Sequence, residues 1–142
     1  MKRLSQTVCL LLVCALILSV PAFATEVSPW ASNYFLRHSC YIDEISSTSF
    51  EVWFEVTAIR GMDKLGVSEI KIQRSTDRDN WSTVETYSMD DYSNLICEDT
   101  GTHSGYVTYS SATSGYYYRA KVTFYAKDGN NTAEYIMYTS SI

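Results

Sequence analysis

Proline is nearly missing from this chain of 142 residues, since both copies, Pro21 and Pro29, lie before residue 30. Proline cannot donate a backbone hydrogen bond, so its absence from residues 30–142 leaves each amide there free to pair in a sheet. Histidine is equally rare, with only His38 and His103. Two histidines so far apart do not have the spacing of a zinc site. We therefore expect no bound metal, and no motif indicates another cofactor.

Runs of basic residues along the sequence are also missing. The chain has 11 Lys and Arg against 16 Asp and Glu, which gives a net charge of −5. The first 24 residues hold two of the positive charges and no acidic residue, so the remainder carries −7. Gripping a phosphate backbone requires clustered Lys and Arg, which excludes nucleic acid as an expected partner. An anionic membrane surface would repel such a chain as well.

Only one apolar run is long, and it lies at the N-terminus. Lys2 and Arg3 precede an apolar run at residues 8–20, which is followed by the helix breaker Pro21 and the small-x-small tripeptide 22–24. This order of segments is typical of a secretory signal peptide. The run is shorter than the ~20 residues of a spanning helix, so we expect no integral membrane span after cleavage. An uncleaved N-terminal anchor is the alternative.

The predicted organisation is a signal peptide at 1–24, a flexible mature N-terminus at 25–33 and one domain at 34–142. The domain keeps two cysteines, Cys40 and Cys97. In an oxidising compartment one intramolecular bridge is available to them. In the loop-entropy model that bridge would stabilise the domain by roughly 4 kcal/mol. Two free thiols and an intermolecular bridge are the alternatives.

Tyrosine, β-branched residues and short polar breaks dominate the domain, which is a strand-forming composition. The clearest signals are strict alternations of apolar and polar residues at 50–58 and 115–126. We interpret 60–66 as a connection with one helical turn and 89–104 as a polar loop. The last strand has two possible registers. The predicted strands cover residues 34–45, 50–58, 67–74, 81–87, 105–109, 115–126 and 133–139.

About seven short strands without a convincing helix predict an all-β fold, an antiparallel β-sandwich. The Tyr-x-Ala-x-Val-x-Phe run at 118–124, the Ile-x-Ile-Gln-Arg-Ser stretch that opens 70–84 and the Phe-x-Val-x-Phe strand at 50–54 carry a resemblance. They resemble a fibronectin type III-like or immunoglobulin-like domain. In such domains a tyrosine at the start of the penultimate strand closes a corner, and Tyr116 or Tyr118 matches that place.

The whole chain also resembles a domain-of-unknown-function family of short secreted proteins from Gram-positive bacteria. That resemblance implies a bacterial, extracellular location. The chain departs from immunoglobulin domains in its cysteines, because Cys40 falls in the first predicted strand and not in the second. The usual inter-sheet bridge is therefore not implied by the resemblance.

Three aromatic residues stand on the polar side of their predicted strands. Trp53 alternates with the buried positions of 50–58, and Tyr117 and Tyr125 do the same in 115–126. Exposed rings of this kind stack on sugars or peptides, so the three form a candidate ligand-contact face. The alternative is cross-strand pairing on the outer surface of the sheet.

Signals for an enzyme are weak. His103 and Ser104 are neighbours, but adjacent side chains on an extended segment point to opposite faces, so they do not form a nucleophile and its base. Asp90, Asp91 and Glu98 are the carboxylates that a small secreted hydrolase would use. Together with Asp99 they are also the candidate ligands of a cation, and a solvated loop is the alternative. No catalytic residue is assigned from the sequence.

The function expected from these observations is that of a secreted, non-catalytic β-sandwich protein. Its expected role is extracellular or cell-surface binding, with an unidentified extracellular protein or glycan as partner. A small secreted hydrolase is one alternative. A secreted toxin, bacteriocin or inhibitor is the other.

Cleavage is expected between Ala24 and Thr25, because Ala22 and Ala24 are the small residues that a signal peptidase accepts. N-terminal sequencing of secreted protein should read Thr-Glu-Val-Ser. A sequence that starts at Met1 would instead show an uncleaved anchor.

Overall fold

The computed structural model describes residues 33–142, and about 73% of this part is β-strand, with no α-helix. The strands are β1 (Phe35–Ser46), β2 (Ser49–Ser75), β3 (Ser82–Ser88), β4 (Ile96–Tyr109), β5 (Tyr117–Asp128) and β6 (Asn131–Tyr138), with a short 3₁₀ turn, η2 (Ser93–Leu95), before β4. The all-β class predicted from the sequence is confirmed. The expected signal segment 1–24, its cleavage site and nearly all of 25–33 lie outside the described residues.

All six strands belong to one antiparallel sheet, and β2 lies at its centre. The first half of β2 pairs with β1 on one edge and with β4 on the other. Its second half pairs with β5 and β3, while β6 extends the sheet beyond β5. One continuous strand therefore holds four of the other five in register.

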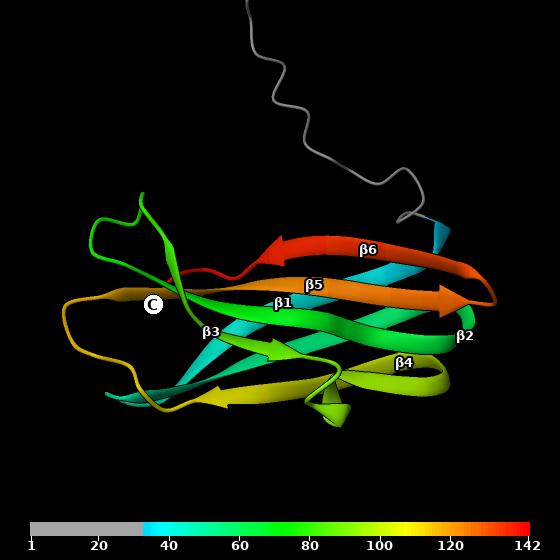
Figure 1. Ribbon diagram of the computed structural model, residues 1–142, viewed down its shortest axis with the longest axis horizontal. Coiled ribbons are helices and arrows are strands. Elements are labelled where there is room, and N and C mark those ends of the chain that lie inside the picture. The colour runs from blue at the N-terminus through cyan, green and yellow to red at the C-terminus, as the bar shows by residue number, and fades with distance from the viewer. Residues whose placement is uncertain (1–32) are drawn as a thin grey trace, which may run out of the picture.

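The sheet is curled, so that the two halves of β2 lie in two layers (Figure 1). In that view β2 turns near its label and its second half runs back across the first half. Aromatic pairs bridge the layers at both ends of the core. Phe50 of β2 contacts Tyr118 of β5, with ring centroids 5.5 Å apart. At the other end His38 of β1 lies 5.3 Å from Phe124 of β5.

Alternation along β2 explains why one of its faces is buried. Phe50, Val52, Phe54 and Val56 are almost fully enclosed, whereas the residues between them point outward. In β5 the even positions from Tyr118 to Ala126 are buried in the same way. Burying each large apolar side chain contributes about 1.5–3 kcal/mol, so this pattern fixes which face turns inward.

The expected connection with a helical turn at 60–66 is wrong, because β2 runs through it without a break. Met62 and Leu65 are both buried there and continue the inward row. Irregularities between Thr57 and Met62 in the pairing with β4 absorb the change in spacing. Two predicted strands are thus one, and the described part has six strands where the sequence indicated about seven.

The prediction of a polar loop at 89–104 is wrong for the second half of that segment, because strand β4 begins at Ile96. Its first residues pair with positions 62–66 of β2, and its many polar side chains face outward. The register of β6 is also fixed by the structure. Ala133 is buried and Met137 packs against the core, so the face that includes Tyr135 is the inward one.

Gly66 permits the close approach of η2 to β2. It has φ +155°, and a Cβ atom there would lie 2.0 Å from the carbonyl oxygen of Leu95. We expect Gly66→Ala to lower the free energy of unfolding by about 2 kcal/mol or more, because backbone must move. Urea denaturation measures this.

Gly61→Ala is the matched control in the same strand, since no atom lies within 4 Å of its added Cβ. It should change the free energy of unfolding by no more than about 0.5 kcal/mol. Equal effects of the two substitutions would contradict the close packing of η2 on β2.

Candidate functional site

A pocket of about 390 Å³ opens at the seam between β3 and β4, beside η2. We call it the seam pocket. Three tyrosines, one carboxylate, one amide and two further β4 residues line it: Glu85, Tyr87, Tyr92, Asn94, Tyr106, Val107 and Thr108. Its volume falls within the range of about 300–1,000 Å³ usual for small-molecule sites.

The free edge of β4 forms one wall of the seam pocket, and side chains satisfy its backbone carbonyls. Asn94 donates its amide Nδ2 to the carbonyl oxygen of Tyr106 at 2.9 Å, and Tyr87 donates its hydroxyl to that of Thr108 at 2.9 Å. The ring of His103 is bonded through Nε2 to the carbonyl oxygen of Asn94 at 2.9 Å. These bonds hold η2 and β3 against β4, which gives the pocket a fixed shape.

Tyr106 belongs at once to the pocket and to a row of three rings across the outer surface. Its ring lies 4.6 Å from that of Trp53, and the ring of Tyr41 lies 6.3 Å from Trp53 with nearly parallel planes. The three residues are direct cross-strand partners in β1, β2 and β4. We call this row the outer ladder.

Trp53 is the central member of the outer ladder and is oriented by a hydrogen bond. Its Nε1 donates to the carboxylate of Glu51 at 2.9 Å. The rings of Tyr41 and Tyr106 remain about half exposed at the two ends of the row. Trp53 therefore packs against the ring of Tyr106, a residue that also lines the pocket.

Most polar side chains that line the seam pocket are neutral hydrogen-bonding groups, and one is a carboxylate. Burial, and then the nearby charge of Glu85, raise the pKa of the Tyr87 hydroxyl to about 12, so it stays protonated at neutral pH. Tyr87 and Tyr92 meet edge to face at 5.1 Å. Among the lining residues Glu85 is the only carboxylate.

The structure does not bring Trp53, Tyr117 and Tyr125 together. Trp53 lies on the outer surface of the layer formed with β1 and β4, whereas the other two lie on the outer surface of the opposite layer. Tyr117 and Tyr125 are separated by eight positions of β5, about 26 Å at ~3.3 Å per residue. Tyr117 is instead covered by the guanidinium of Arg78, 3.9 Å from its centroid.

Cys40 and Cys97 are both free thiols in the structure, and the expected bridge between them is not present. The strand pairing gives the reason. Cys40 lies opposite Phe54 on one edge of β2, and Cys97 lies opposite Leu65 on the other edge. Strands on either side of a third are about 9.6 Å apart, beyond the ~7 Å between Cα atoms that a disulfide spans.

The carboxylates considered for hydrolysis or cation binding are dispersed. Asp90 and Asp91 lie exposed in the turn after β3, and Glu98 forms an ion pair with Lys64 at 3.5 Å. In the part of the chain that the structure describes, no three His, Cys, Asp or Glu side chains are placed to hold a metal ion. His103 packs against Phe54 and η2, away from its exposed neighbour Ser104.

Sequence reasoning missed Tyr41, Tyr87, Tyr92 and Tyr106 as site residues. Tyr106 lay in a predicted strand, and its alternation with Val107 already indicated an outward ring. The sequence contains no signal for the neighbours of Tyr106, because no pattern in it shows that β4 lies beside Trp53. Pairing partners are set by the fold of the whole chain.

Within residues 33–142 no helix is long and apolar enough to cross a membrane. No protein-family model matches the chain, and searches of curated proteins and of solved structures found no match. The seam pocket and the outer ladder are therefore interpreted from their own geometry.

Thiol titration tests the state of the cysteines. Two thiols should react per chain of residues 25–142 in denaturant without reductant, because neither is bridged. In native Cys97→Ser protein, Cys40 should react slowly at pH 8, since burial raises the pKa of its thiol to about 11. Its rate should rise about tenfold per pH unit below that pKa. Absence of any reactive thiol in the denatured protein would show that the bridge forms.

Proposed function

We propose that this chain is a secreted, non-catalytic binding domain whose seam pocket takes a sugar unit of an extracellular glycan. The observation that carries the proposal is the position of Tyr106, which lines the pocket and whose ring packs against that of Trp53, 4.6 Å away and tilted by 30°. A pyranose ring has an apolar face of C–H groups and a rim of hydroxyls. An oriented aromatic ring beside fixed polar groups matches both features.

The lining residues supply partners for the hydroxyls of such a ring. Glu85 offers a carboxylate that accepts hydrogen bonds, and Asn94 offers an amide oxygen while its Nδ2 is used by Tyr106. Tyr92 is exposed and meets Tyr87 edge to face, so its ring stands at the mouth of the pocket. One carboxylate among three tyrosines supports binding and not bond cleavage.

The finer fold type, a fibronectin type III-like or immunoglobulin-like sandwich, is part of the proposal. Tyr118 supports it, because its buried hydroxyl accepts a hydrogen bond at 2.9 Å from the backbone N–H of Thr113, five residues upstream. That geometry is similar to the tyrosine corner of such domains. The segment at 1–24 supports secretion, which would bring the pocket into contact with glycans outside the cell.

Glycan-array screening followed by calorimetry on the strongest ligand tests the function. Tyr106→Ala should weaken binding about tenfold or more, since it removes the ring on which the sugar stacks. Tyr92→Ala should weaken it similarly. Thermal melting should show that both variants remain folded, because both side chains are exposed.

Tyr41→Ala is the matched control, because Tyr41 ends the same ladder on the side away from the pocket. It should change the affinity less than about twofold. Unchanged binding by Tyr106→Ala would remove the seam pocket as the site. Capture of peptides but no glycan by the wild-type protein would refute the proposed ligand class.

A further inference from the structure

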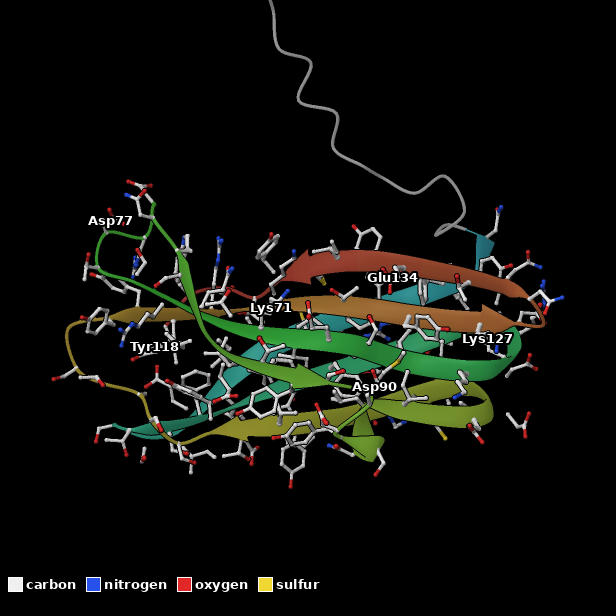
Figure 2. The ribbon with its side chains drawn as sticks, viewed as in Figure 1. Lys71, Asp77, Asp90, Tyr118, Lys127 and Glu134 are labelled. Carbon is white, nitrogen blue, oxygen red and sulfur yellow. The ribbon has the colours of Figure 1, made fainter. Side chains whose placement is uncertain are left out.

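The outer surface of the other layer carries a cluster of three cations at the centre of the sheet. Lys71 of β2 and Lys121 of β5 are direct cross-strand partners, and Arg119 lies two positions from Lys121 on the same face. Figure 2 shows Lys71 near the middle of this layer. Directly opposed side chains have Cβ atoms about 4.5–5.5 Å apart, and like charges there repel. We call this group the basic cluster.

Arg119 is held rigidly within the basic cluster. Its guanidinium carbon lies 4.2 Å from the ring centroid of Trp81 and 4.6 Å from that of Tyr138, so the group is stacked between two rings. Its Nε donates to Oε1 of Gln73 at 2.9 Å. A guanidinium has five N–H donors, so four remain for a ligand. Their direction is set before any ligand arrives.

Neighbouring carboxylates neutralise the basic cluster only in part. Glu69 forms an ion pair with Lys71 at 2.8 Å. Glu134, the other carboxylate considered, accepts a hydrogen bond from Ser68 and not from a cation of the cluster. Within residues 33–142, neither Arg119 nor Lys121 forms an ion pair with a carboxylate. Arg119 and Lys121 are unpaired and lie beside a third cation, Lys71. They give this surface a positive electrostatic potential, although the chain as a whole has a net charge of −5.

We propose that the basic cluster binds an oxyanion, a sulfate or phosphate group carried by an extracellular polymer. Arg119 provides a planar fork of donors, the geometry that matches such groups, and the two lysines provide point charges beside it. A bound oxyanion would offset the repulsion between Lys71 and Lys121. The site is separate from the seam pocket, which lies on the other side of β3 at the edge of β4.

Binding of residues 25–142 to dextran sulfate, to polyphosphate and to uncharged dextran tests the proposal and separates the sulfate source from the phosphate source. At least one of the two anionic polymers should bind, and the affinity should fall steeply between 50 and 200 mM salt, roughly as counterion release requires. Titration with inorganic sulfate and phosphate should shift the Nε–H signal of Arg119 in NMR spectra. Uncharged dextran should not bind.

Lys121→Gln and Arg119→Lys should each weaken binding about fivefold or more. Arg119→Lys keeps the positive charge. A loss of affinity in this variant would therefore show that the stacked, planar guanidinium is needed and that charge alone is not sufficient. Lys127→Gln is the matched control, since Lys127 lies on the same strand and face, opposite Lys64, but near the far end of β5 (Figure 2). It should weaken binding less than about twofold.

Equal losses in Lys127→Gln and Lys121→Gln would overturn the proposal, because they would show only general attraction to positive charge. Failure of both anionic polymers to bind would overturn it too. Tyr106→Ala should leave this binding unchanged, so the result is independent of the seam pocket. Lys121→Gln leaves the rings around Arg119 in place, which keeps the test valid if Arg119→Lys disturbs folding.

Discussion

The continuous pairing of β2 with four other strands is the constraint on which the structure depends. Residues 49–75 form one strand of 27 residues, and its two halves belong to the two layers of the curled sheet. The register of β2 therefore sets the register of β1, β3, β4 and β5 together. A shift by one position would turn every buried side chain of its inner face outward, which makes the arrangement strongly specified.

Both candidate binding surfaces follow from that register. The outer ladder exists because Trp53 stands between Tyr41 and Tyr106 on neighbouring strands, and the basic cluster exists because Lys71 stands opposite Lys121. Each surface includes one cross-strand pair that is distant in sequence, Trp53 with Tyr106 in the first and Lys71 with Lys121 in the second. The two surfaces differ in chemistry, with carboxylates near the first and cations in the second.

Alternation in the sequence was sufficient to predict the all-β class and the inward faces of residues 50–58 and 115–126. It was not sufficient to predict pairing, because period two says which side chains share a face but not which strand lies beside them. Residues 60–66 were misread since their spacing changes at irregular pairs between Thr57 and Met62. The predicted grouping of Trp53 with Tyr117 and Tyr125 was wrong because alternation does not show that their strands lie in different layers.

The long reach of the β2 pairings also determines how the chain can fold. The β1–β2 and β5–β6 hairpins close through two-residue turns, so they can form locally. Phe50 pairs with Tyr109, however, and Lys64 with Lys127, and each such contact closes a loop of about 60 residues. During synthesis β2 is complete well before these partners exist. Completion of the sheet therefore waits for residues 96–128, and we expect folding on the slow timescale of non-local β topologies, about milliseconds to seconds.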